Sequence, residues 1–130
     1  MSNLFRNNRN IVLVFNAHKS HDKKCRAAAL SLDKNAVTID ISKAKVGAMD
    51  WLKIAGYLGV QVEDLINKNH PDFLDLYQRN EIDLDDTSAL KILHSHAEVL
   101  KFPIAIQNGH ALFLKSKNEI YRLEELEEEE

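Results

Sequence analysis

An uninterrupted apolar run near the start of the chain, Ile11-Val12-Leu13-Val14-Phe15, is the feature that most narrows the possible folds. A continuous row of β-branched and aliphatic residues, without polar alternation, is typical of a strand that is buried on both faces. Such a strand belongs in the middle of a sheet. The run therefore predicts a mixed sheet in an α/β protein.

The segments that follow this strand predict a parallel β-α-β unit. Ser20 is expected to cap a helix that runs to about Leu32, with Asp22 as an acidic residue of its first turn. The range 36–41 is a second β-rich run. Two parallel strands joined by a helix require a right-handed crossover.

Helices are expected through the middle of the chain. An apolar stripe at helical spacing predicts an amphipathic helix that ends near Gly59; it consists of Trp51, Leu52, Ala55 and Leu58. Short helices are expected over 62–66 and from Pro71, and a longer one begins near Asp86.

The last third of the chain predicts a β-hairpin followed by a helix. Asn108-Gly109 is the strongest short hairpin signal, and the flanking strands are expected over 102–106 and 111–114. Ser116 or Asn118 caps a final helix. The whole order is β-α-β, a helical insertion, then β-β-α, which predicts a thioredoxin-like α/β fold with a mixed four-stranded sheet.

Charge and hydropathy divide the chain into three parts: a polar leader over 1–10, a single domain over 11–123, and an acidic tail over 124–130. Six of the 20 acidic residues lie in the tail, so residues 1–123 carry 17 basic against 14 acidic residues. This small basic excess does not favour DNA binding. No apolar stretch approaches the roughly 18 residues of a membrane span, and no secretory signal is recognisable. A cytoplasmic monomer without a membrane partner is expected.

Cys25 is the single cysteine, which excludes an internal disulfide and CxxC redox motifs. We interpret it as a partly buried structural residue. The alternative is a mildly activated thiol beside Lys23, Lys24 and Arg26.

The histidines do not predict a metal centre. His18, His21 and Cys25 form an H-x2-H-x3-C pattern, but a fourth ligand is missing, so no metal and no cofactor are expected. His94 and His96 lie two positions apart on a predicted helix, and we expect one to face the core and the other the solvent.

The loop His18-Lys19-Ser20-His21 precedes a predicted helix and combines amide donors, a lysine and a hydroxyl. Such a combination is a generic arrangement for binding an anion. Many helix N-termini nevertheless bind nothing.

The order of elements and three stretches of sequence resemble the arsenate reductase (ArsC) family, which includes the transcription regulator Spx. The stretches are Asn16 at the end of the first strand, 57–68 (YLGVQVEDLINK) and 98–104 (EVLKFPI). The likeness covers about residues 11–122. It implies a thioredoxin-like fold with a helical insertion.

The resemblance also implies that the active site of the family is degenerate here. Family members carry His-Asn-Pro-x-Cys after the first strand, and the matching stretch, 15–19, keeps only Asn16. Lys19 stands at the position of the nucleophilic cysteine, with Asp22 and Lys23 at those of the second cysteine or serine and the following arginine.

The family's three oxyanion-binding arginines correspond by position to Asn67, Phe102 and Lys115. Pro103 matches the family's cis-proline. The resemblance therefore implies that the oxyanion clamp is almost wholly absent.

Three functional hypotheses follow. The first is a catalytically degenerate, non-enzymatic binding or regulatory protein with an unknown protein partner; RNA polymerase is suggested by the likeness to Spx alone. The second is a divergent arsenate reductase or thiol oxidoreductase that uses Cys25. The third is small-anion binding at a vestigial pocket formed by Asn16, His18, Lys19, Ser20, His21, Pro103 and Lys115.

Overall fold

A four-stranded mixed sheet forms the centre of the computed structural model, which describes residues 9–124. The strand order is β2-β1-β3-β4, with β1 parallel to β2 and the other two pairs antiparallel. The strands are β1 (Val12–Phe15), β2 (Val37–Asp40), β3 (Ile104–Gln107) and β4 (His110–Phe113). The predicted mixed sheet is confirmed.

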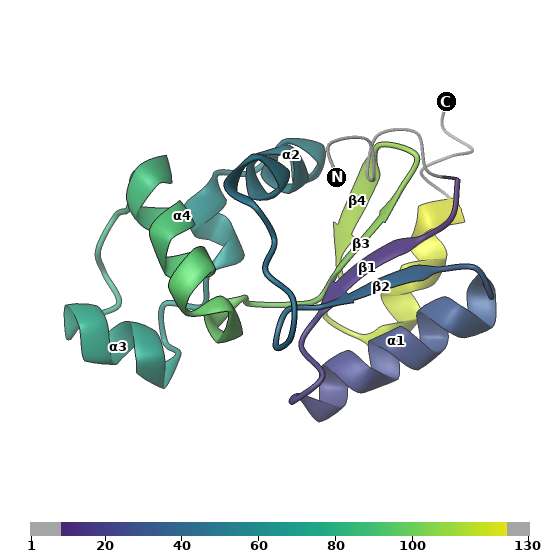
Figure 1. Cartoon of the computed structure of the whole chain (residues 1–130), viewed down its shortest axis with the longest axis horizontal. Helices are drawn as coiled ribbons and strands as arrows, with labels where there is room; N and C mark the ends of the chain where they lie inside the picture. Colours follow the sequence, from purple (N-terminus) through teal and green to yellow (C-terminus); the bar gives the residue numbers. More distant parts are fainter. Residues whose placement is uncertain (1–8, 125–130) are drawn as a thin grey trace.

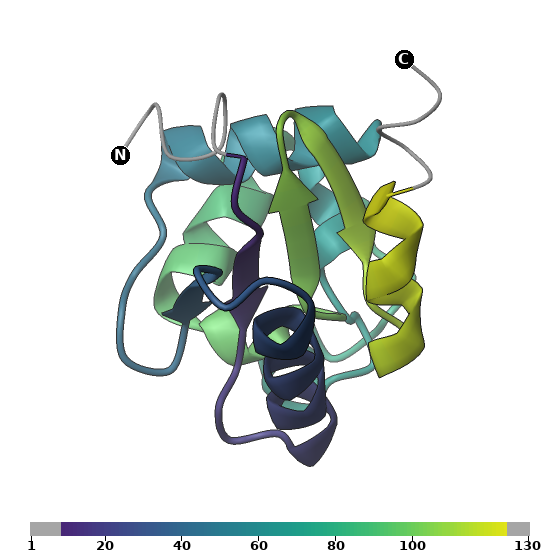
Figure 2. The ribbon, with the colours of Figure 1, turned by 90° about the vertical axis from the view of Figure 1, so that its right-hand side faces the viewer.

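The two faces of the sheet are covered by different helices (Figures 1 and 2). Helix α1 (Ser20–Leu32) and the 3-10 helix η3 (Lys117–Tyr121) cover one face, where Leu13 and Phe15 pack against Cys25 and Ile120. Helix α2 (Ala48–Leu58) and the rest of the insertion cover the other. Alternate residues of β1 thus enter opposite cores, which explains why its whole sequence is apolar.

The insertion between β2 and β3 contains α2, η1 (Val62–Leu65), α3 (Pro71–Tyr77), α4 (Asp86–Ser95) and η2 (Ala97–Val99). In Figure 1, α3 and α4 lie on the side of α2 away from α1. An antiparallel bridge between Ile66 and Leu100 joins the segment after η1 to the segment before β3. This pairing sets the position of η2 relative to the sheet.

Local sequence signals predicted the end of α2 and the turn of the hairpin correctly. Gly59 follows α2 with φ 72°, the left-handed conformation in which glycine carries no Cβ penalty. Asn108 (φ 52°) and Gly109 (φ 83°) form the turn between β3 and β4.

One predicted detail, the N-cap of α1, was wrong. The N-cap of α1 is Lys19, and Ser20 is already helical, because the turn after β1 is closed by backbone hydrogen bonds and not by a serine cap. The predicted final helix is confirmed: Ser116 is its N-cap, residues 117–121 form the 3-10 helix η3, and α-helical residues follow at 122–124.

The leader over 1–10 and the acidic tail lie mostly outside the described residues, so these predictions stay untested. Within residues 9–124, no helix has the length and apolar composition needed to cross a membrane.

Candidate functional site

The loop between β1 and α1 is a tight turn held by its own backbone and by Asn16. The Asn16 side chain is buried, and its Oδ1 accepts the His18 N–H at 2.9 Å. The Lys19 N–H donates to the Asn16 carbonyl oxygen at 3.0 Å. The asparagine therefore shapes the loop.

Two carboxylates satisfy the remaining amides of this loop. Asp22 Oδ2 accepts the Asn16 N–H at 2.9 Å, and Asp40 Oδ1, at the end of β2, accepts the Ala17 N–H at 3.1 Å. All four amides of residues 16–19 thus donate to acceptors of the protein itself. These loop amides are already committed before any external anion could use them.

Asp22 is only 4% exposed, although the sequence suggested an ordinary first-turn acid. Burial raises the pKa of its carboxyl; the Asn16 hydrogen bond and the Lys19 and His21 charges oppose this rise. Keeping the Asp22 carboxyl ionised therefore lowers the free energy of unfolding.

At pH 7 we expect the free energy of unfolding of Asp22→Asn to equal or exceed that of the wild type, since the asparagine side chain can still accept the Asn16 N–H. Because the pKa of the Asp22 carboxyl is higher in the folded than in the unfolded chain, its protonated form favours folding. This contribution to stability is fully present below the unfolded pKa of 3.8 and is lost as pH rises through the folded pKa. The advantage of the asparagine should vanish near pH 3. Asp22→Ala, which removes the acceptor, should cost about 1–3 kcal/mol. Urea unfolding at both pH values measures this, and an Asp22→Asn variant as unstable as Asp22→Ala would contradict it.

Lys19 directs its ammonium group at the protein. Its Nζ donates to the carbonyl oxygens of Glu98 at 3.3 Å and Leu100 at 3.2 Å. These contacts connect the loop to η2 and to the segment before β3. The lysine thus links two parts of the chain about 80 residues apart.

Cys25 is fully buried in the second turn of α1. Burial, with smaller contributions from the Asp22 and Glu119 charges, raises the pKa of its thiol to about 11. The sequence interpretation of a structural cysteine is supported, but the side chain is buried completely and not partly. Activation of the thiol by the nearby lysines would require a lowered pKa, whereas the pKa of Cys25 is raised.

His21 does not provide a base for Cys25. Its Nε2 lies 3.7 Å from Cys25 Sγ and 2.9 Å from the carbonyl oxygen of Leu114. A carbonyl oxygen can only accept, so Nε2 carries the proton and donates to Leu114. That nitrogen therefore has no lone pair available to take the thiol proton.

The other predicted pocket residues surround the same end of α1. His18 and Ser20 are exposed, Lys115 is exposed after β4, and Pro103 is buried before β3. The Leu114 N–H donates to the Pro103 carbonyl oxygen at 2.8 Å, which brings the segments before β3 and after β4 together beside His21. The structure thus gathers these residues in one region, while anion binding there stays a prediction.

The resemblance to the family's cis-proline left the isomer of Pro103 open, and among the described residues every peptide bond is trans. Trans is the lower-energy isomer of an X–Pro bond. At the family's arginine positions, Asn67 donates its N–H to Val99, and the Phe102 ring packs edge-on against Phe113 with centroids 6.2 Å apart.

A cleft of about 450 Å³ opens beside the loop. Asn16 and His18 line it together with residues 41–46 on one side and several residues of 93–98 on the other. Lys45 crosses to donate from Nζ to the His94 carbonyl oxygen at 2.8 Å. Sequence reasoning missed this cleft, because it forms between an irregular segment after β2 and the C-terminal end of α4 with η2, which are about 50 residues apart in the chain.

The H-x2-H-x3-C residues do not assemble into a metal site. In the described part of the chain, the three-residue group with metal-binding geometry is Asp72, His96 and Glu98, whose ligand atoms lie within 4.8 Å of one another. One of His94 and His96 was expected to face the core and the other the solvent, but neither faces the core. Helix α4 ends at Ser95, so His96 lies beyond its last turn, with 38% of its side chain exposed.

The sheet order, the β-α-β and β-β-α halves and the helical insertion define a thioredoxin-like α/β fold. No family model matches the sequence, and no curated protein sequence matches it. The similarity lies in the three-dimensional structure.

Several of the solved structures that match are described as arsenate reductases or as proteins related to them. Arsenate reductase from Vibrio cholerae superposes with a TM-score of 0.76 at 16% identity, over 89% of this chain and 98% of the other. A possible arsenate reductase from Streptococcus mutans gives 0.67 at 17% identity, over 88% and 98%. An arsenate reductase (ArsC) related protein from Brucella melitensis gives 0.58 at 18%, over 88% and 92%. At these identities the comparison establishes the fold, so this chain has an arsenate reductase-like scaffold.

Proposed function

We propose that this chain is a non-enzymatic binding or regulatory protein built on an arsenate reductase-like scaffold. The observation that carries the proposal is the position of Cys25, which is buried within α1 and not exposed at its N-terminus. A thiol with a pKa of about 11 is ionised in only about one molecule in ten thousand at pH 7. The thiolate is the nucleophile in thiol chemistry, so this side chain is poorly suited to the reaction.

The residue at the N-terminus of α1 does not replace the thiol. Lys19 has no redox chemistry, and a lysine ammonium is a poor nucleophile at neutral pH unless desolvation lowers its pKa. Its Nζ is instead within hydrogen-bond distance of the Glu98 and Leu100 carbonyl oxygens. This supports a structural role for Lys19.

Oxyanion recognition is weakened in the same way. By resemblance, Asn67 and Phe102 stand where the family has arginines, and neither can supply the bidentate guanidinium fork that suits an oxyanion. Lys115 keeps a positive charge without that geometry. A binding role on this scaffold requires none of these groups.

The partner that we propose is a protein of the same cytosol, and RNA polymerase is the first to test because of the resemblance to Spx. With a single buried cysteine, binding should not respond to thiol oxidants.

The first test is arsenate reduction with glutathione and glutaredoxin as the reductants. We expect neither the wild type nor Cys25→Ser to show turnover above the protein-free background. Turnover that Cys25→Ser abolishes would establish the thiol-enzyme alternative and remove this proposal.

The second test addresses binding. The full chain should be titrated against RNA polymerase from its own source, with and without a thiol oxidant, and then used for affinity capture from that cytosol. If instead millimolar phosphate shifts NMR signals of residues 17–22 while no protein is retained, small-anion binding would be the better description.

A further inference from the structure

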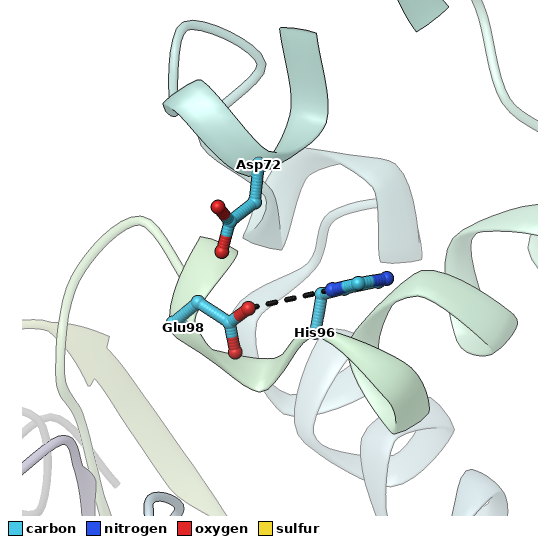
Figure 3. A group of neighbouring side chains, drawn as sticks. All are labelled: Asp72, His96 and Glu98. Carbon is cyan, nitrogen blue, oxygen red and sulfur yellow. Dashed lines mark ion pairs between the residues drawn. The ribbon is translucent and has the colours of Figure 1, made fainter. Parts of the chain in front are cut away.

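Three side chains from separate elements of the insertion converge on one point (Figure 3). Asp72 comes from the first turn of α3, His96 from the residue after α4, and Glu98 from η2. One ligand atom from each lies within 4.8 Å of the other two. The His96 Nδ1 atom is 3.4 Å from Glu98 Oε1.

The negative charges gathered at this point favour binding of a cation. The ligand atoms of Asp72 and Glu98 lie within 4.8 Å of each other, so two carboxyl groups stand close together. The ion-pair contacts of these carboxylates are with imidazoles, His96 beside Glu98 and His70 beside Asp72 at 3.9 Å. His70 Nδ1 is already used as the acceptor of the Asp72 N–H.

The donor set narrows the class of cation. Two carboxylate oxygens and one imidazole nitrogen suit zinc and the neighbouring divalent transition metals, whereas all-oxygen sites are typical of calcium and magnesium. The three side chains are 38–42% exposed, so water can complete the coordination. Three protein ligands plus water is a common arrangement for zinc.

We propose that Asp72, His96 and Glu98 bind one divalent transition-metal ion, with Zn²⁺ as the representative ion. Such an ion joins α3 to η2, two segments that the chain separates by α4. The main-chain oxygen of Glu98 also accepts a hydrogen bond from Lys19 Nζ. The ion would therefore stabilise the insertion next to the loop after β1.

The test is isothermal titration of the full chain with Zn²⁺ in the presence of a competing chelator. We expect one Zn²⁺ per chain at the tightest site. His96→Ala and the double variant Asp72→Asn/Glu98→Gln should each weaken that affinity at least about tenfold. Co²⁺ should show an absorption band in the wild type that His96→Ala loses.

Matched controls come from exposed neighbours of the same types. His94→Ala, two residues before His96, and Asp75→Asn, in α3, should leave the affinity unchanged. Thermal unfolding of every variant without metal separates a lost ligand from a lost fold.

Several results would overturn the proposal. These are the absence of Zn²⁺ binding at millimolar concentration, an unchanged affinity in His96→Ala, and an equal loss in His94→Ala. A tightest site that instead disappears in His21→Ala/Cys25→Ser, or on replacement of the tail glutamates, would place the ion elsewhere in the chain.

Discussion

Cys25 in the native protein should react with iodoacetamide at least about a hundred times more slowly than in the urea-unfolded chain at the same pH. Its pKa rises from 9.0 to about 11 on folding, which by itself lowers the thiolate population about a hundredfold. Complete burial of the side chain adds a barrier to the reagent. Alkylation followed by mass spectrometry measures both rates.

The control is a thiol at the N-terminus of the same helix. In a Lys19→Cys/Cys25→Ser variant, the amide dipoles of α1 favour the thiolate, and we expect much faster alkylation than at native Cys25. A native Cys25 that reacts as fast as the unfolded chain would show that α1 opens readily, and would reopen the thiol-enzyme hypothesis.

The same shift makes the stability of the protein depend on alkaline pH. Because the folded-state pKa lies above the unfolded one, stability from the neutral thiol is fully present below pH 9 and is lost as pH rises toward 11. The loss is limited to about 3 kcal/mol. Comparing urea unfolding of the wild type and Cys25→Ala across this range isolates the thiol, since lysines and tyrosines titrate in both.

Trp51→Ala should lower the free energy of unfolding by about 3–5 kcal/mol. Trp51 is 1% exposed and belongs to the core between α2 and the sheet, in the same cluster as Val12 and Val14. Removing the indole leaves a large cavity at the contact between the insertion and the sheet. Urea unfolding monitored by circular dichroism measures the loss.

Met49 provides a matched control in the same helix because it is 68% exposed. Met49→Ala should change stability by no more than about 0.5 kcal/mol. Trp51→Phe should cost less than Trp51→Ala, since it keeps most of the ring and removes an indole N–H that lacks a hydrogen-bond partner in the described structure. Similar losses in Met49→Ala and Trp51→Ala would contradict the assigned core.

The elements of the fold were predictable because their signals are local. The apolar run of β1, Gly59 after α2 and the Asn108-Gly109 turn each depend on a few adjacent residues, and all three lie where expected. What the local signals did not predict is which groups individual side chains bind. Asp22 lies in the first turn of α1 as predicted, but its burial and its hydrogen bond from the Asn16 N–H were not predicted.

The candidate sites were predictable only in part. The count of one cysteine and its distance from the start of α1 already argued against a reductase. Its complete burial depends on packing against β1 and η3, which no spacing rule describes. The Asp72, His96 and Glu98 group has no sequence pattern at all, because the bridge between Ile66 and Leu100 and the turns of the insertion bring its members together.

The sequence by itself therefore determined the strands, the hairpin, the helical insertion and the absence of a second thiol, since these follow from composition and short-range periodicity. Only the tertiary structure decided that Lys19 holds carbonyl oxygens of the segment 98–100, that Cys25 is sealed in a core, and that three ligand side chains meet. The physical reason is that such contacts join residues tens of positions apart. Their geometry is set by how helices and sheet pack, which local propensities do not specify.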